Sequence, residues 1–573
     1  MPDCNSDKMP ARWFKDEHVI VLTLFVLGFL LRITNLSAVP FNSTEALNAL
    51  DALSVSRFSS MRTAASPIYQ SLSAINFYLF RATPFFARFW PALAGSSLAL
   101  VPLLWRKKLG SLNTLLLAGA LAFDPVLVTL SRQADGAIFT VVGLIWALTF
   151  FRERKPLGFG ILLAVAWLSG PWFWISGGVS ILGVGLYALS QTRGGMETIA
   201  ASCPFRTKNF RNAAALSFFV SIVVLSTGFF LNPAGISGAA GGLARFWSST
   251  RGTAQLAPTA ALFRLIAYSI PVIMLAIPAV LSAWREKSKL EQVVSLLAGL
   301  TLIAILLFRR QGAAGFALLH VLLWFLAIDT LQKQIQLVPE HKNITLGAFI
   351  LAAAICGYLA LSLRNLVNPV QTGYTFGQSA IAFILGLLLL LLVFVLIMLG
   401  WSLTTARKGI LSAVMLGMMA FLFSLSFLSL ETSNPYPALV WSDSTLWVSA
   451  GTQQSLLREI EKLGKLEPQI TRVAITDPEL ESLSWEFRDY QNVAISAALP
   501  ESSAPGIILS NITNPQNTAD SYRGVQLSNP GKVPWGKLSP TELLRSAIRR
   551  KLPVENIEYI LWIRQDLMTG ALP

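Results

Sequence analysis

The sequence predicts a polytopic α-helical membrane protein that ends in a small α/β domain. Hydrophobic residues make up 54% of the 573-residue chain and charged residues only 13%, and the mean hydropathy is +0.58. A soluble protein needs far more charge to cover its surface, whereas long apolar segments with few charges are typical of membrane spans. Beyond residue 430 the apolar runs shorten to strand length, which predicts a domain outside the membrane.

The net charge of +15 indicates membrane orientation and not nucleic-acid binding. Most Lys and Arg residues fall in the short connections between apolar segments. Such residues gather on cytoplasmic loops, so they report topology. Cys4, Cys203 and Cys356 are far apart and form no CxxC or Cys/His pattern, so neither a zinc site nor a disulfide framework is predicted.

A cytoplasmic N-terminus, residues 1–18, precedes a transmembrane domain, residues 19–430, with about thirteen apolar spans. The spans lie near residues 19–36, 84–105, 112–130, 136–151, 156–169, 171–190, 212–232, 262–284, 291–308, 313–330, 344–363, 378–402 and 409–429. Alternate connections each carry at least two cations, which places the C-terminal domain outside. Gly170-Pro171 could be a kink in one helix or a turn between two.

Three segments on the outside are too long to be turns. Residues 37–83 predict two helices on the membrane surface, Glu45 to Arg57 and Pro67 to Phe80. Residues 233–261 are rich in Gly, Ala and Ser, which fits either a mobile loop over a cavity or a solvated connector. The third segment is the C-terminal domain, residues 431–573.

The C-terminal domain alternates strand-like and helix-like runs. Strands are expected at 472–476, 506–510 and 558–563, and helices at Gln453 to Leu463 and Thr541 to Arg550, which predicts an α/β domain. It has neither a Gly-rich phosphate loop nor a nucleophile–base signature. We therefore expect a binding or docking module that offers a surface to a protein partner.

Several motifs resemble the GT-C superfamily of membrane glycosyltransferases, which use lipid-linked sugars and include the protein mannosyltransferases. The stretch 86–95 is similar to an "ARLLPALxG" element, and 130–134 to an "SRxA" element. In the tail, 484–493 resembles "WYLRDYPNV", and 521–524 and 561–567 resemble later elements of one branch. That branch is the flippase activity-associated family of archaea and Chloroflexota.

The resemblance implies a GT-C fold and transfer of a sugar from polyprenyl phosphate to a hydroxyl, with inversion. Family members place an Asp–Glu pair in the first loop, where this chain has Thr44-Glu45. Glu45 is thus the candidate general base, and a divalent cation against the donor phosphate is a further implication. The alternative for Glu45 is an acid that favours a helix N-terminus, with Ser43 or Thr44 as cap.

Other positions depart from the family pattern. The "SRxARND" element has Ala137 in the place of its Asp, and Asp135 lies two residues earlier. On a helix Asp135 would point about 200° away, so it substitutes only if the backbone there is not helical. The family's His-Gly-Pro is Ala65-Ser66-Pro67, a Lys-Glu pair is Gly170-Pro171, and of "EKMPW…H" only His320 is kept. These losses point to an altered or an absent transfer reaction.

Four residues are candidates for binding the donor phosphate. Arg132 is a lipid-phosphate or structural ligand, or a snorkelling side chain. Arg309 and Arg310 form a double cation in a predicted outside turn, suited to a phosphate headgroup or to anionic lipid. His320 is a phosphate contact or a hydrogen-bonded core residue. Asp124 lies inside a span beside Pro125, and an intramembrane acid is a functional hint.

The first reading is a transferase in the cytoplasmic membrane that handles a polyprenyl-phosphate-linked sugar at the outer face, with Glu45 as base. The rival is an inactive scaffold or accessory subunit that docks a partner through residues 431–573. Both involve membrane lipid and neither involves nucleic acid. A transporter is disfavoured because no internal repeat is found.

Overall fold

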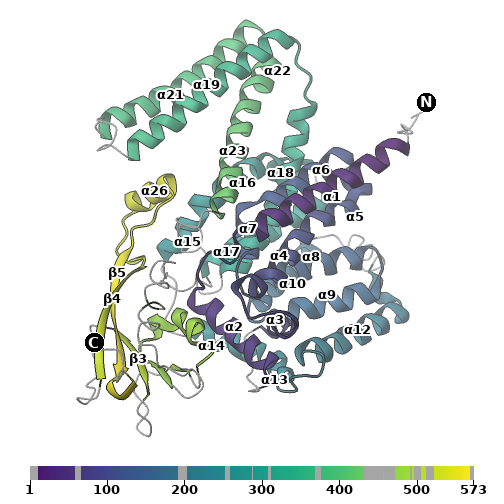
Figure 1. Cartoon of the computed structure of the whole chain (residues 1–573). Helices are drawn as coiled ribbons and strands as arrows, with labels where there is room; N and C mark the ends of the chain where they lie inside the picture. The colour runs from purple at the N-terminus through teal and green to yellow at the C-terminus, as the bar shows by residue number, and fades with distance from the viewer. Residues whose placement is uncertain are drawn as a thin grey trace.

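The computed structural model describes most of the chain. The described residues are 11–58, 66–190, 203–251, 258–286, 288–307, 312–367, 376–430, 472–490, 493–495, 505–511 and 522–567, together with Leu456 and Arg458. Figure 1 shows a large bundle of helices with a sheet at one side, and the N-terminal end of α1 lies on the opposite side from that sheet.

The membrane bundle is built from long apolar helices, and each of the predicted spans falls largely on one helix or helix pair. Nine helices of the described part are long and apolar enough to cross a membrane, or ten if the pair α6 and α7, bent by 48°, counts as one span. The helices that match the predicted spans are α1 Ala11–Ile33, α4 Pro84–Ser97, α5 Val101–Leu109, α6 Ser111–Phe123, α7 Pro125–Ser131, α8 Ala137–Arg152, α9 Pro156–Leu168, α10 Trp172–Ser190, α12 Lys208–Ser226, α15 Pro258–Arg264, α16 Ile270–Glu286, α17 Lys289–Leu307, α18 Gly312–Gln336, α19 Lys342–Val367, α21 Phe376–Gly400 and α23 Ser412–Leu428. The short helix α22 Leu403–Ala406 lies in the predicted connection between the last two spans.

The Gly170-Pro171 step is a turn between two helices. Helix α9 ends at Leu168 and α10 begins at Trp172. Gly170 has φ +104°, a conformation that side chains with a Cβ rarely adopt. The break separates α9 from α10, and α9 packs mainly against α8 and α12.

Helices α2 (Ser43–Ser56) and α3 (Pro67–Leu79) confirm the two helices expected in the first loop. A capping box begins α2: the Asn42 side chain accepts the Glu45 N–H, and the Glu45 carboxylate accepts the Asn42 N–H. The cap is thus Asn42 and not Ser43 or Thr44. Pro67 opens α3, where its missing N–H costs nothing.

The segment 233–261 is helical where it is described, which corrects the expectation of a loop or connector. It contains α13 (Gly235–Ala240), α14 (Gly242–Arg251) and the start of α15. Its small residues permit close packing: a side chain at Gly235 would collide with the Ser226 carbonyl. The Trp167 Nε1–H also donates to the Ala239 carbonyl, 3.3 Å away.

The C-terminal domain carries a mixed five-stranded sheet of order β2-β1-β3-β5-β4. The strands are β1 Val473–Ile475, β2 Val493–Ile495, β3 Ile507–Asn511, β4 Tyr522–Lys532 and β5 Glu555–Arg564. The first three pair in parallel, and β5 runs antiparallel to β3 and β4. Helix α26 (Pro540–Arg549) confirms one predicted helix, whereas Gln453 to Leu463 lies almost wholly outside the described residues. Strands β2 and β4 were not predicted.

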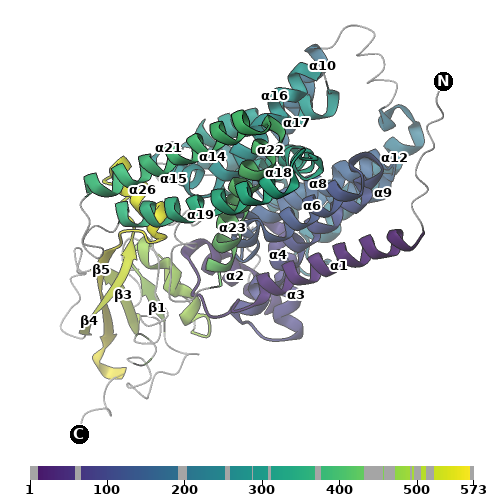
Figure 2. The same ribbon diagram turned by 90° about the horizontal axis from the view of Figure 1, so that it is seen from above.

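The C-terminal domain packs on the first loop through η6 (Pro478–Phe487), which contacts α2. Trp485 is 2% exposed and meets Phe41 edge to face at 5.1 Å, and Phe77 at 6.0 Å. At the rim, Arg57 Nη2 lies 2.7 Å from Asp489 Oδ1. Figure 2, viewed from above, also places the sheet beside the end of the bundle that holds α2.

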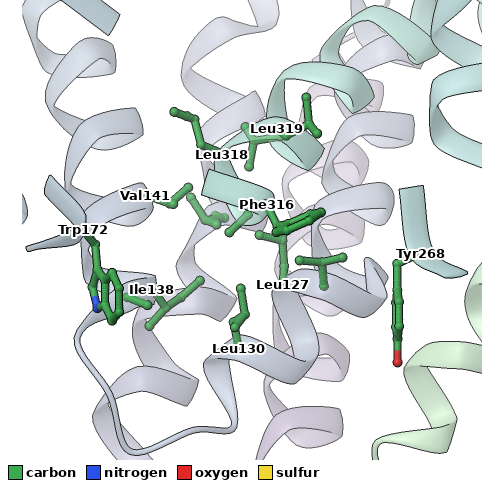
Figure 3. Close-up of a cluster of buried hydrophobic side chains, with 14 of the residues drawn as sticks. Leu127, Leu130, Ile138, Val141, Trp172, Tyr268, Phe316, Leu318 and Leu319 are labelled. Atoms are coloured by element: carbon green, nitrogen blue, oxygen red, sulfur yellow. The ribbon is translucent and has the colours of Figure 1, made fainter. Parts of the chain in front are cut away.

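The main hydrophobic core runs through much of the bundle, and one part of it lies where α7, α8 and α18 meet the start of α10. Figure 3 shows Leu127 and Leu130 of α7 close to Ile138 of α8 and Phe316 of α18. Because α7 and the start of α8 are fixed by this core, the segment between them, residues 132–136, is held in a defined position.

Candidate functional site

The candidate site is a buried polar junction where the first loop meets residues 131–136, and Glu45 is at its centre. Both Glu45 oxygens are bound by the Arg88 guanidinium, with Nε–Oε1 2.8 Å and Nη2–Oε2 2.9 Å. The Ala134 N–H donates to Oε1 at 2.7 Å, and the Asn42 N–H to Oε2 at 3.2 Å. The carboxylate is 5% exposed and Arg88 3%. Glu45 is therefore a fully bonded, buried anion.

Arg88 also fixes the chain before α2. Its Nη1 donates to the carbonyls of Leu36 (2.8 Å) and Val39 (2.7 Å), and its Nη2 to that of Pro40 (3.1 Å). The guanidinium lies 4.7 Å from the Phe41 ring centroid, a cation–π contact. Helix α4 thus holds the start of the first loop, residues 36–45, through one side chain.

Asp135 lies next to the Glu45–Arg88 pair, one residue after Ala134. It is outside any helix, because α7 ends at Ser131 and α8 begins at Ala137. The geometric condition for Asp135 to act in place of the missing Asp is therefore met. Its Oδ1 accepts the Gly136 N–H at 2.5 Å and lies 3.4 Å from Asn48 Nδ2. Asp135 is only half-buried, in contrast to Glu45.

Two further arginines tie α1 to the junction. Arg32 is fully buried and donates to the Ser131 hydroxyl (2.9 Å) and to the Ala122 carbonyl (2.7 Å). Arg132 donates through Nη1 to the carbonyls of Leu31, Arg32 and Thr34, at 3.1, 2.9 and 2.7 Å. Arg132 thereby binds the carbonyls that end α1, and it is 8% exposed.

His320 lies in a second polar cluster, inside the bundle. Its Nδ1 is 2.7 Å from Asp124 Oδ2, and its Nε2 is 2.9 Å from the Ser269 hydroxyl. Asp124 also accepts the Trp324 Nε1–H at 2.7 Å and the Leu127 N–H at 2.9 Å. His320 and Asp124 are both fully buried. Asp124 accordingly caps α7 at the bend after α6, with His320 as its partner.

The structure thus brings three of the predicted site residues, Glu45, Arg132 and Asp135, to one junction. His320 lies apart from them, and Arg309 and Arg310 lie outside the described residues. Arg88 and Trp324 were not predicted as partners of the two buried acids. Arg88 could have been predicted as the partner of Glu45 from the sequence, because a buried carboxylate needs a cation and Arg88 belongs to the motif at residues 86–95.

Tyr69 of α3 carries a further buried hydroxyl group, which the charges of Glu45 and Asp135 influence. Its side chain is 1% exposed, and its hydroxyl has no hydrogen-bond partner among the described residues. Burial raises the pKa of the phenol, with a smaller contribution in the same direction from the charge of Glu45. Tyr69 therefore stays neutral at physiological pH.

The junction can fix charge and orient a hydroxyl, but its described residues do not fit a resident metal ion. No three His, Cys, Asp or Glu side chains come together for a metal among the described residues. The one fully buried carboxylate of the loop, Glu45, has both oxygens bound by Arg88. A divalent cation at Glu45 would have to displace the Arg88 guanidinium, which binds both carboxylate oxygens with two parallel hydrogen bonds.

The comparisons with known proteins identify the fold. No family model and no curated protein matches the sequence. ArnT of Cupriavidus metallidurans bound to undecaprenyl phosphate is similar in structure, with a TM-score of 0.52 and 12% identity over 88% of this chain and 94% of that one. Apo ArnT gives 0.54 and 13% over 87% and 93%. The oligosaccharyltransferase of Archaeoglobus fulgidus tethered to an acceptor peptide gives 0.45 and 13% over 88% and 70%. The chain is a multi-pass membrane protein with a GT-C fold.

Proposed function

We propose that this protein is a GT-C-type glycosyltransferase that takes a sugar from polyprenyl phosphate at the outer face of the cytoplasmic membrane. The observation that carries the proposal is the similarity over 88% of the chain to a structure bound to undecaprenyl phosphate. The polar junction lies at the loop end of α1, where a lipid headgroup and a water-borne acceptor would meet.

Asp135 is the proposed base, in place of Glu45. A base must come within about 2.6–3.2 Å of the proton that it takes. Glu45 has four donors on its two oxygens, whereas Asp135 is half-buried and stands on a non-helical segment beside it. Glu45 then positions Asp135 through the Ala134 N–H.

In the proposed reaction Asp135 removes the proton of an acceptor hydroxyl, and the oxygen attacks the anomeric carbon of the donor. The bond from that carbon to the phosphate oxygen breaks with inversion, and polyprenyl phosphate leaves with the electron pair. The cations of the junction, with Arg132 the most exposed of its arginines, offset the charge on the phosphate. Arg309 and Arg310 are further candidates for this contact.

A second candidate function is a non-catalytic scaffold that docks a partner. The saturation of Glu45 by Arg88 favours it, because the family-like acid then has a structural role. The C-terminal domain would offer the docking surface.

The test compares wild type with Asp135→Asn in release of polyprenyl phosphate from several polyprenyl-phosphate sugars. Asp51→Asn, a half-buried acid of the same loop, is the matched control. We expect the D135N variant to lose at least about 100-fold in rate, as for loss of a general base, with the donor still bound. Turnover that survives D135N rules out Asp135 as base, and donor binding without wild-type turnover supports the scaffold.

A further inference from the structure

We propose that α26 and the residues after it form a binding site for anionic phospholipid headgroups at the membrane surface. This inference concerns a surface away from the polar junction and does not depend on sugar transfer. It rests on where α26 packs, on how its side chains divide around the helix, and on its charge.

Helix α26 belongs to the sheet domain but lies on membrane helices. It contacts α15 and α19, and Leu543 and Ala547 are buried in the main core of the bundle. Figures 1 and 2 both place α26 beside the end of α19. The domain therefore rests on the bundle through this helix.

Arg550 gives the depth of the helix in the membrane. It ends α26 in a left-handed conformation, with φ 55°. Its Nη2 lies 2.6 Å from the Ser424 hydroxyl, and its guanidinium 5.4 Å from the Phe421 ring centroid. Both residues lie within two turns of the end of α23, or roughly 10 Å along the helix axis. This is the depth at which headgroups meet acyl chains.

The surface of α26 divides into three sectors at 100° per residue. Leu543, Ser546 and Ala547 face the protein. Arg545 and Arg549, one turn apart, are both exposed and lie about 155° and about 115° from the centre of that buried sector. Leu544, which is 47% exposed, lies between the two. An apolar sector beside a basic one is the pattern of an interfacial helix.

The charge of this segment selects the partner. Residues 540–551 hold four cations, Arg545, Arg549, Arg550 and Lys551, against the single acid Glu542. Arginines bind phosphate oxygens in two bonds, and the depth of Arg550 places that phosphate at headgroup level. An anionic phospholipid supplies both the phosphate and an acyl chain for Leu544.

The test counts lipids bound to the full-length protein in neutral detergent by native mass spectrometry, with phosphatidylglycerol or phosphatidylcholine added. The test variant is R545Q/R549Q, because Gln keeps helix propensity while removing charge. The matched control is R472Q/R523Q, two exposed cations at the opposite end of the sheet from α26. Arg523 is aligned with Ile563, near the end of β5, and Arg472 precedes Val473, which lies in the same row of the sheet, whereas α26 comes before the start of β5 at Glu555.

We expect wild type and the control to prefer phosphatidylglycerol, and the test variant to bind it about 30-fold more weakly at low salt. Thermal unfolding of each variant verifies its fold. Equal binding of the two lipids by wild type, or an unchanged affinity of the folded test variant, overturns the proposal. So does displacement of phosphatidylglycerol by millimolar inorganic phosphate, or binding that only polyprenyl phosphate shows, because the site then takes a bare phosphate or the donor lipid.

Discussion

Replacing Glu45 with Gln tests whether this acid holds the junction together. The substitution keeps the size of the side chain but removes the negative charge and turns an amide group toward Arg88. Both partners are at most 5% exposed, so the guanidinium loses its counter-ion where water cannot replace it. Removing one partner of a buried pair costs about 3–5 kcal/mol. Three backbone carbonyls still bind Arg88, so we expect the lower end of that range.

The assay is unfolding of the purified protein in mixed micelles with increasing SDS, monitored by tryptophan fluorescence. Glu153→Gln, at the exposed end of α8, is the control and should change the unfolding free energy by less than about 0.5 kcal/mol. A double-mutant cycle with Arg88→Gln should give a coupling of about 1–3 kcal/mol. If E45Q unfolds like wild type and still abolishes sugar transfer, the structural role is refuted and Glu45 is catalytic.

Three other changes test separate parts of the fold. His320→Ala should lower the unfolding free energy by about 3 kcal/mol or more, because Asp124 loses its buried partner. His341→Ala, at an exposed helix start, should leave the unfolding free energy nearly unchanged. Equal losses of unfolding free energy in the two variants would contradict the role of the Asp124–His320 pair. Trp485→Ala should lower the unfolding free energy by about 3–5 kcal/mol and speed proteolytic release of the C-terminal domain. Arg57→Ala, which removes a half-exposed ion pair, should lower it by at most about 1 kcal/mol. A larger loss for Arg57→Ala than for Trp485→Ala would show that the ion pair, and not the apolar contact, docks the domain. Gly136→Ala should destabilise by about 1–3 kcal/mol and weaken donor binding, because the new Cβ would collide with Ser66 and the Ser169 carbonyl; Gly178→Ala meets open space and should leave binding unchanged.

The fold followed from the sequence wherever one property of a segment decided its structure. Long apolar runs form helices in a membrane because the backbone must satisfy its own hydrogen bonds there. The strands β1, β3 and β5 were found because apolar residues fill them, with β3 buried along most of its length. Strand β4 contains Gly524 and Pro530, residues that disfavour strands, and only its pairing with β5 makes it one.

The junction was harder to predict because its partners are set by packing between distant segments. Glu45 was found from its loop, but Arg88 is 43 residues away and nothing local links them. Asp135 could not be assigned, since its use depends on whether the backbone there is helical. The segment 233–261 was expected to be irregular from its composition, yet its small residues serve close helix packing.

The positions of the two polar clusters along the chain have a consequence for synthesis. Among the described residues, every group that binds Glu45 or Arg88 lies within the first 134 residues, so this part of the junction can close while the rest of the chain is still on the ribosome. Asp124 must wait for His320, which follows it by 196 residues. Domains form from the N-terminus as the chain emerges. The first helices would therefore be in the membrane while Asp124 still lacks its partner His320, until α18 is inserted. The order of insertion thus makes α18 the segment that completes the bundle.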